Sequence, residues 1–466
     1  MTSERRLYVG PSLRRLRRDL GLTQSDMAQD LEVSASYIAL LERNHRPLSA
    51  EMLVRLAQTY RLDVAALAAE SGDDSARLRA ALRDPMFGGI ELKALEVADA
   101  AANFPGVTEA FLRLYTAYRE EQLALADRSV DGRDGEDASD PVAESRRFLA
   151  ARRNSFPLLD DAAERLAQAV AADEGLAGHL KARHGLRVRR LPPDVMTGAT
   201  RRLDRHRREV LLDDTLDGAS QSFQLALQTA YLELEAEIGE VLAEGAFETE
   251  GGQRLTRRAL ASYAAAALLM PYTAFARAAE ARRYDVEALA RQFGASFEQT
   301  AHRLTTLQKP GQERVPFFFI RVDEAGNVSK RLDGAGFPFA RHGGGCPLWS
   351  LHQAFRTPRQ IVTQWLELPD GQKFFSIART VTAGGGGFGA PRIERAIALG
   401  CAEEHAHRLV YAADHRGGPE QATPIGVTCR LCHRADCAAR SAPPIGRQIL
   451  PDDYRRTLAP FGFSDA

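Results

Sequence analysis

The chain has 466 residues, of which 44% are hydrophobic and 26% are charged, and its formal net charge is -1. A chain of this length normally divides into several folded units rather than forming one continuous core. The composition is typical of a globular protein and excludes a collagen, a wholly disordered chain and a protein with many membrane spans. Five cysteines, an odd number, argue against a disulfide framework and favour metal or redox chemistry wherever they cluster.

Residues 1–70 carry short helical patterns with clear start and stop signals, which predict the first domain. Thr23 is a suitable cap for a helix that carries Met27 inward, and Ser34 is a suitable cap for the next helix. This segment resembles the helix-turn-helix of phage-repressor-like regulators. In that arrangement the second helix lies in the DNA major groove and reads base edges. The alternative is a helical bundle that binds no nucleic acid.

The same resemblance assigns the residues that would contact DNA. They are Gln24, Ser34, Ala35, Ser36, Tyr37, Asn44 and Arg46. The side chains of Ala35, Ser36 and Tyr37 would read base edges, whereas Gln24 and the two residues after the second helix would hold phosphates. Glu32 stands at the turn, where many such motifs have glycine. We therefore expect either left-handed strain at Glu32 or a slightly different turn.

The next part of the chain is predicted to connect two folded regions. Residues 71–125 continue as a helical connector, and residues 126–144 are rich in Asp, Gly, Ser and Glu, which predicts a flexible linker. Helical patterns resume over residues 145–310. Within them, residues 259–276 carry no charge over 18 residues, the lower limit for crossing a bilayer. Polar residues and Pro271 inside this stretch favour a buried amphipathic helix that ends near the proline.

Residues 222–231 resemble the helix on which zinc peptidases of the IrrE type carry the motif His-Glu-x-x-His. In that motif two histidines one turn apart bind zinc, and the glutamate between them activates water. In this chain Leu227 and Tyr231 occupy the histidine positions, and Gln228 occupies the glutamate position. We therefore interpret residues 145–310 as a degenerate peptidase-like module and predict that the chain is not an enzyme. An active metallopeptidase of the IrrE type is the rival interpretation.

After residue 310 the pattern changes, and β-branched and aromatic runs alternate with turn sequences, as in residues 315–323 and 361–368. This pattern predicts an α+β domain over residues 311–466. The predicted fold class is therefore multidomain. It combines an all-α helix-turn-helix region and an α-rich degenerate peptidase-like module with an α+β C-terminal domain.

The C-terminal domain contains a C-x2-C-x4-C array. Its members are Cys429, Cys432 and Cys437. Three thiolates this close in sequence predict a site for one tetrahedral zinc or one iron-sulfur cluster, with a fourth ligand from farther away. We favour Cys401 as that ligand, because it ends a helical-looking segment that can turn toward the array, and Cys346 is the alternative. A core of reduced, packed cysteines is the other interpretation of the array.

Taken in order, these regions resemble the short-chain fatty acyl transcriptional regulator (ScfR) family. Residues 302–308 and 346–355 look like sequence of this family, and the likeness covers nearly the whole chain outside the linker. The resemblance implies a DNA-binding transcription regulator of propionate, acetate or related acyl-CoA metabolism, whose C-terminal sensor domain takes an acyl-CoA as effector. Some members are described as carrying an iron-sulfur cluster, so we favour a 4Fe-4S cluster over zinc at the cysteines.

Expected partners complete this interpretation. A helix-turn-helix on a short half-site predicts a homodimer or higher homo-oligomer on a double-stranded DNA operator, because symmetric operators pair with symmetric proteins. The chain begins without the apolar core of a secretory signal peptide, so we expect a cytoplasmic protein without a membrane partner. A redox or metal sensor without an acyl-CoA effector is the remaining rival.

Overall fold

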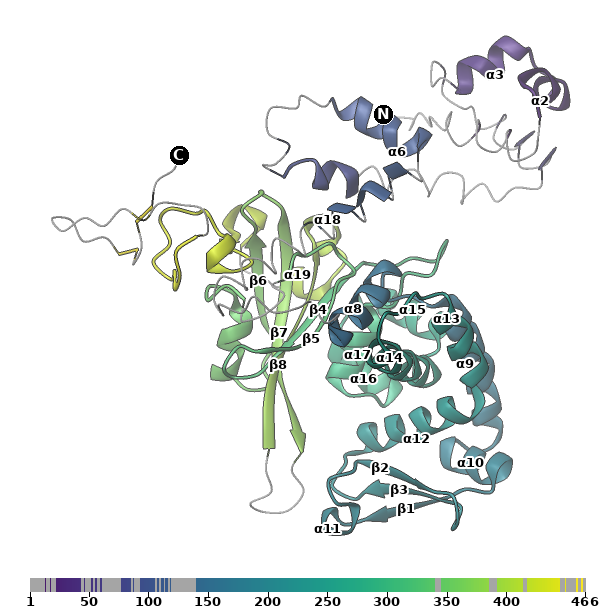
Figure 1. The fold of residues 1–466 in the computed structure, drawn as a ribbon, viewed down its shortest axis with the longest axis vertical. Helices are drawn as coiled ribbons and strands as arrows, with labels where there is room; N and C mark the ends of the chain where they lie inside the picture. The colour runs from purple at the N-terminus through teal and green to yellow at the C-terminus, as the bar shows by residue number, and fades with distance from the viewer. Residues whose placement is uncertain are drawn as a thin grey trace. The chain divides into compact units, whose positions relative to one another are not determined.

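The computed structural model describes residues 22–42, 77–84, 93–104, 140–339, 345–384, 392–413 and 417–444, with shorter pieces elsewhere. The chain divides into two compact units, residues 1–125 and 126–466, and each has hydrophobic clusters of its own. Figure 1 shows helices in the first unit and helices together with two sheets in the second. The predicted multidomain fold class is confirmed.

The helix-turn-helix of the first unit consists of α2 (Gln24–Asp30) and α3 (Ala35–Glu42). Thr23 caps α2, because its hydroxyl accepts a hydrogen bond from Asp26 N while the Asp26 carboxylate accepts one from Thr23 N. Ser34 caps α3, where its Oγ accepts a hydrogen bond from Tyr37 N. The residues that form the buried core of this region are Leu13, Met27, Ala28, Leu31, Ile38, Leu41, Met52 and Leu56.

The region predicted as connector and linker is described in part. The connector contains α6 (Ala94–Asn103), whose Val97 lies in one small cluster with Leu78. Of the predicted linker, residues 126–139 lie outside the described residues. Helix α8 begins at Pro141, because the Asp140 side chain caps it and proline suits the first helical position. The linker predicted to reach residue 144 therefore extends too far.

The middle module is mainly helical, as predicted. Its helices are α8 (Pro141–Ala151), α9 (Pro157–Ala172), α10 (Leu176–His184), α11 (Pro193–Met196), α12 (Gly218–Glu233), α13 (Glu235–Ala243), α14 (Glu250–Leu269), α15 (Tyr272–Ala281), α16 (Val286–Phe293) and α17 (Phe297–Leu304). The alanine-rich α14 lies at the centre of the module. Its residues Leu260, Ala264 and Ala265 are fully buried, and they share one cluster with residues of α8, α9 and α12.

Within the described part of the chain, no single helix is long and apolar enough to cross a membrane. The pair α14 and α15, bent by 66°, together has the length and composition of a broken membrane span. Met270 and Pro271 separate these two helices, so α14 ends next to the proline as the sequence predicted. Ala267 and Phe275, one from each helix, are fully buried in the hydrophobic core of this unit.

A small sheet that the sequence did not predict lies between α10 and α12. Its strands are β1 (Arg187–Leu191), β2 (Arg201–Asp204) and β3 (Glu209–Asp213), in the order β1-β3-β2. The central β3 pairs with β1 in parallel and with β2 in antiparallel orientation. The two edge strands are short, rich in arginine and contain no fully buried residue, so they lack the apolar alternation by which strands are predicted.

The C-terminal domain is built on a six-stranded sheet in the order β5-β4-β8-β7-β6-β9. Its strands are β4 (Phe318–Val322), β5 (Val328–Leu332), β6 (Val362–Glu367), β7 (Lys373–Gly384), β8 (Arg392–Ala402) and β9 (Thr423–Pro424). Neighbouring strands are antiparallel, except for β6 and β9. Strands β7 and β8 extend beyond the rest of the sheet as a two-stranded ribbon (Figure 1).

The segment that ends at Cys401, which we predicted to be helical, forms strand β8 instead. Its residues 396–401 are buried on both faces of the sheet, so the sequence lacks the alternation of a half-exposed strand. Short helices surround the sheet. They are η2 (Ser350–Arg356), α18 (Glu403–Ala406), α19 (Val410–Ala413), η3 (Pro419–Gln421) and η4 (Cys429–Leu431).

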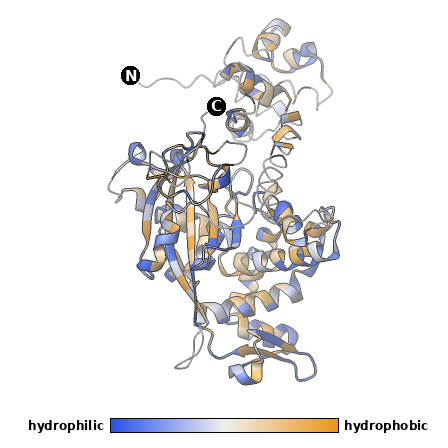
Figure 2. Cartoon of the chain, turned by 60° about the vertical axis from the view of Figure 1, so that its left-hand side comes forward, coloured by the Kyte–Doolittle hydropathy of each residue, from blue (hydrophilic) through white to orange (hydrophobic). Residues whose placement is uncertain are grey.

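The two faces of this sheet belong to different hydrophobic clusters. One face, which carries Phe375, Leu399 and Cys401, packs against α15, α16 and α17 of the middle module. The opposite face, which carries Phe318 and Phe374, packs against η2 and the segment before it. Figure 2 shows the hydrophobic residues along the central strands. The hydrophobic core is therefore continuous across residue 310. A domain boundary at that residue stays a prediction.

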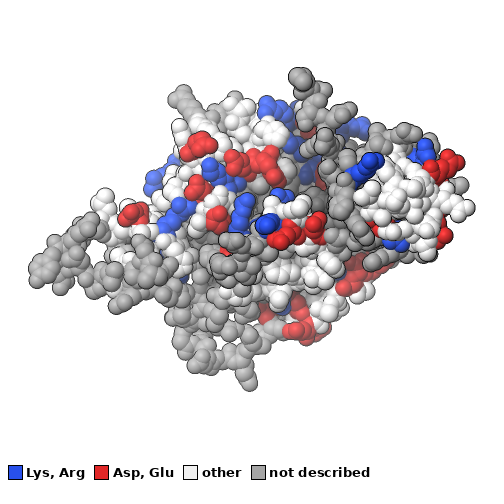
Figure 3. All heavy atoms as spheres, turned by 90° about the horizontal axis from the view of Figure 1, so that it is seen from above, with Lys and Arg blue, Asp and Glu red and all other residues white. Residues whose placement is uncertain are grey.

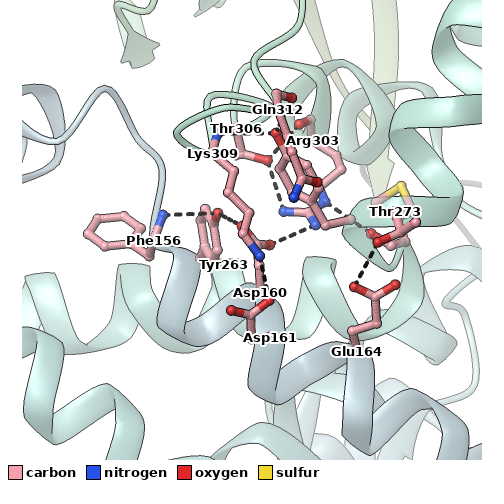
Figure 4. Close-up of polar contacts among 12 residues, drawn as sticks. Phe156, Asp160, Asp161, Glu164, Tyr263, Thr273, Arg303, Thr306, Lys309 and Gln312 are labelled. Atoms are coloured by element: carbon pink, nitrogen blue, oxygen red, sulfur yellow. Dashed lines mark hydrogen bonds and ion pairs between the residues drawn. The ribbon is translucent and has the colours of Figure 1, made fainter. Parts of the chain in front are cut away.

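A buried ion pair joins helices of the middle module to one another (Figure 4). Arg303 Nη2 donates to Asp160 Oδ1 at 2.8 Å, and both side chains are fully buried. Tyr263 Oη donates to the other oxygen of Asp160 at 2.6 Å, and Arg303 Nε donates to the Met270 carbonyl at 3.1 Å. Burial and the Asp160 carboxylate raise the pKa of Tyr263 well above its usual value. The network therefore fixes α9, α14 and α17 against one another.

Candidate functional site

The N-terminal end of α3 presents the predicted base readers. Ser34, Ala35 and Ser36 are exposed, and the hydroxyl oxygens of Ser34 and Ser36 lie 3.0 Å apart. Tyr37 is half-buried, and the guanidinium of the exposed Arg46 lies 5.9 Å from the centre of its ring. The structure therefore brings these five residues together, and the three small ones are open to a ligand such as DNA.

Gln24 has an internal role as well. Its Nε2 donates to the Glu42 carboxylate at 2.7 Å, while Arg17 Nε donates to the other oxygen of that carboxylate at 2.6 Å. Glu42 is buried, and its hydrogen bond raises the pKa of Arg17. Gln24 thus ties the start of α2 to the end of α3 and keeps a second amide hydrogen for a phosphate. Asn44, also predicted to contact phosphates, lies outside the described residues.

The turn between α2 and α3 has the strained geometry that was one of the two expected alternatives. Glu32 adopts a φ of 53°, in the left-handed region that favours glycine. The carbonyl of the preceding Leu31 accepts a hydrogen bond from Arg55 Nη1 at 3.0 Å.

In the view of Figure 3, positive and negative side chains are interspersed, in keeping with the formal net charge of -1.

The positions that would hold zinc in a peptidase lie on α12. Leu227 packs against the core, and Gln228 is buried. The guanidiniums of Arg201 and Arg257 lie 5.5 and 5.7 Å from the centre of the Tyr231 ring. These side chains offer neither a zinc ligand nor a general base. Across the described residues, no group of three or more His, Cys, Asp and Glu side chains is arranged to hold a single metal ion.

Four of the five cysteines line one cavity in the C-terminal domain. They are Cys346, Cys429, Cys432 and Cys437. The last three follow β9, and η4 carries the first of them, whereas Cys346 lies just before η2. Cys346 and Cys432 are buried, and the other two are half-buried. The fold therefore brings the predicted array together with Cys346, the alternative fourth ligand.

Cys401, the favoured fourth ligand, does not line this cavity. Its side chain is fully buried on the face of the sheet that packs against the middle module, and burial raises the pKa of its thiol to about 12. Cys346 belongs to the cluster on the opposite face. Successive side chains of a strand point to opposite faces, so the position of Cys401 on β8 directs it away from the array. We therefore replace Cys401 with Cys346 in the proposed ligand set.

Backbone groups surround the sulfur atoms. Ser441 donates to Cys429 Sγ from both its backbone N and its Oγ, each at 3.4 Å. Burial raises the pKa of the Cys346 thiol, and hydrogen bonds from the backbone of Gly426 and Leu348 oppose that effect. A Cβ on Gly426 would lie 2.9 Å from Cys432 Sγ, so only glycine fits without a shift. The sulfur atoms are therefore surrounded by backbone donors, and little free space is left beside Cys432.

A buried arginine also lines the cavity. Arg440 is 3% exposed, and its guanidinium donates to the carbonyl oxygens of Cys429 and Cys432, each at 3.0 Å. A third bond reaches the carbonyl of Arg434 at 2.6 Å. Arg430, Arg434, Arg440 and Arg447 lie near the array in the sequence, but no sequence pattern indicates that Arg440 is buried. Arg440 is buried because the loop from 429 to 440 folds back, so that its side chain contacts the carbonyl groups of residues 429, 432 and 434.

Three parts of the chain match known families. Residues 13–67 match the family described as "Helix-turn-helix", residues 181–305 match "IrrE N-terminal-like domain", and residues 306–461 match "Short-chain fatty acyl coenzyme A regulator, C-terminal". Their order is the one inferred from the sequence motifs.

Relatives match over almost the whole length. The "Propionyl-CoA carboxylase regulator" of Cereibacter sphaeroides is 39% identical over 99% of each chain. The "HTH-type transcriptional regulator RamB" of Mycobacterium tuberculosis is 38% identical over 97% of this chain and 98% of its own. A solved structure, "Mycobacterium tuberculosis transcriptional regulator", is 37% identical with a TM-score of 0.66, and it covers 69% of this chain and 99% of that chain. The chain therefore belongs to the family of short-chain fatty acyl coenzyme A regulators and is a helix-turn-helix transcription regulator, not an enzyme.

Proposed function

We propose that this regulator binds a double-stranded DNA operator through the N-terminal end of α3 and controls genes of propionate or related short-chain acyl-CoA metabolism. The observation that carries the proposal is the exposed set Ser34, Ala35 and Ser36 at that helix end, beside Tyr37 and Arg46. The name of the Cereibacter sphaeroides relative and the description of the C-terminal family support an acyl-CoA as the effector. The middle module would serve as a scaffold without peptidase activity.

The proposed assembly is a homodimer or a higher homo-oligomer in the cytoplasm. A single helix-turn-helix contacts one short half-site, and a two-fold symmetric protein places two such helices on a symmetric operator. An acyl-CoA changes DNA affinity only if it binds one arrangement of these parts better than another.

The cysteine cavity is the proposed site of an iron-sulfur cluster, with 4Fe-4S favoured. Four thiols around one cavity match the set of four cysteine ligands that such clusters take. The backbone donors near Cys429 and Cys346 and the buried Arg440 suit a group with negative charge. An iron-sulfur cluster supplies one-electron redox chemistry when bound. Zinc is the alternative occupant, because four thiolates also suit one tetrahedral zinc.

Selection of DNA and titration with acyl-CoA test the proposed function. Full-length protein prepared without oxygen would select its operator from a random double-stranded library. Propionyl-CoA, acetyl-CoA and free CoA would then be titrated separately against the selected operator. We expect at least one acyl-CoA, but not free CoA, to change the operator affinity by about 5- to 150-fold. Affinity that responds to oxidation or iron removal but to none of these thioesters would instead support the redox-sensing rival.

A further inference from the structure

We infer that Arg440 is the positioning residue of the cysteine cavity, and that its guanidinium supplies the buried positive charge beside the anionic centre held there. The inference rests on the proposed function, since it requires the four cysteines to hold an anionic group. It assigns Arg440 two separable tasks. One is to fix the cysteine loop through hydrogen bonds, and the other is to balance charge.

The task of fixing the cysteine loop follows from the carbonyl groups that accept hydrogen bonds from the guanidinium. Arg440 Nη1 donates to the carbonyls of Cys429 and Ala442, at 3.0 and 3.4 Å. Its Nη2 donates to the carbonyls of Cys432 and Arg434, at 3.0 and 2.6 Å. Two of these four carbonyls belong to cysteines that line the cavity. A planar fork with several donors can hold such a loop, whereas the single ammonium of lysine cannot bind all four oxygens in this geometry.

The second task follows from the missing counter-ion. Among the residues that the structure describes, no carboxylate pairs with Arg440, although its side chain is almost completely buried. Its Nε is also buried without a hydrogen-bond partner. A buried charge is unfavourable unless polar groups or an opposite charge stabilise it. The four carbonyl oxygens provide polar contacts, and an anion in the cavity would add the opposite charge. The cysteine sulfurs that line the same cavity are the groups that would carry this negative charge.

A second arginine of the same cavity provides the contrast. Arg434 also lines the cavity, but its Nη2 donates to the Glu367 carbonyl at 3.0 Å and lies 3.5 Å from the Glu367 carboxylate. Arg434 therefore has a carboxylate partner. Arg440 instead has the ring of Phe463, whose centre lies 4.9 Å from the guanidinium carbon. The guanidinium therefore contacts both the cysteine loop and the Phe463 ring.

The test separates the two tasks with two substitutions of Arg440. Arg440→Lys keeps the positive charge but loses the planar set of guanidinium donors, whereas Arg440→Gln loses the charge. Full-length parent and variants would be prepared without oxygen and compared by circular dichroism, iron and sulfide content, rate of iron loss to a chelator, and midpoint reduction potential. Arg356→Gln, at an exposed arginine at the end of η2, is the matched control.

We expect both Arg440 variants to lose iron about 10-fold faster than the parent or more, because the loop is held less firmly. Only Arg440→Gln should shift the midpoint potential to a more negative value, because removing a positive charge makes reduction of the centre harder. Arg356→Gln should match the parent in every measurement. A merely structural arginine would leave the potential unchanged in any variant that still binds iron.

Three outcomes would count against these proposals in distinguishable ways. A parent protein without iron and sulfide would overturn the proposed cluster together with this inference. A parent that holds the cluster, with Arg440→Gln equal to it in iron loss and potential, would overturn the role of Arg440 alone. If Arg440→Gln fails to fold, Arg440→Lys decides, and a rate of iron loss equal to that of the parent would exclude the positioning task.

Discussion

The DNA-binding helices and the cysteine cavity differ in how far apart in the sequence their residues lie. In the helix-turn-helix, the cap Ser34 and the base readers are consecutive residues, and the local chain alone brings them together. At the cavity, Cys346 and Cys429 come from segments that strands β6, β7 and β8 separate. A change at the first site should therefore act within residues 1–125, whereas a change at the second should disturb contacts across the large unit.

The largest expected effect is at the buried ion pair of the large unit. Arg303→Met should lower the free energy of unfolding of that unit by about 3 to 5 kcal/mol, because Asp160 would remain buried without its partner. Denaturant unfolding measures the loss. Arg254→Met, which removes an exposed ion pair on α14, is the control and should cost less than about 1 kcal/mol. Equal losses in the two variants would show that the buried pair does not hold this unit together.

Close packing at the cavity gives the next effect. Gly426→Ala should destabilise the C-terminal domain by about 1 to 3 kcal/mol, because the new Cβ would lie 2.8 Å from Cys432 Cβ. Gly239→Ala in α13 is the control, since nothing lies within 4 Å of a Cβ there, and it should be neutral or slightly stabilising. Thermal unfolding compares the two variants. An unaltered melting temperature for Gly426→Ala would contradict the tight packing of the cavity.

At the DNA interface the effect should appear in binding rather than in folding. Tyr37→Ala should cost about 1 to 3 kcal/mol of specific operator binding and relax the choice of sequence. Arg46→Ala should weaken binding to all sequences alike, because a phosphate contact carries no sequence information. Fluorescence anisotropy with operator and scrambled DNA measures both. Unchanged operator affinity after replacing both Ser36 and Tyr37 would refute this placement of the readers.

The smallest effect is expected at the turn of the helix-turn-helix. Glu32→Gly should stabilise the first unit by about 0.5 to 1 kcal/mol, because the left-handed conformation costs a residue with a side chain about 1 to 2 kcal/mol. Glycine loses more chain entropy on folding than glutamate does, and this cost cancels about 0.5 to 1 kcal/mol of the relieved strain. Chemical unfolding of full-length protein, followed in the transition of the small unit, tests the sign. A destabilised variant would mean that the Glu32 side chain contributes more than its strain costs.

The sequence predicted those features that local chemistry determines. Caps such as Thr23 and Ser34, the break near Pro271 and the loss of zinc-ligand types at Leu227 and Tyr231 can each be identified from a few neighbouring residues. The family resemblance, carried by several motifs in order, was likewise confirmed.

The rest depended on contacts between distant segments. The sequence of β8 looks helical because the strand is buried on both faces and so shows no alternation. The same error made Cys401 the favoured ligand, whereas tertiary structure brings Cys346 to the array. The Arg17–Glu42 pair and the buried Arg440 could not be predicted, because sequence spacing carries no signal for a partner in another element.

The most direct test of the cysteine site is the iron and sulfide content of two serine variants. Parent, Cys346→Ser and Cys401→Ser would be prepared without oxygen, and iron and sulfide per chain would be measured with the visible absorption spectrum. We predict that the parent and Cys401→Ser carry the same cluster and that Cys346→Ser loses it. Loss of iron in Cys401→Ser with retention in Cys346→Ser, or a parent without iron and sulfide, would contradict the proposed site.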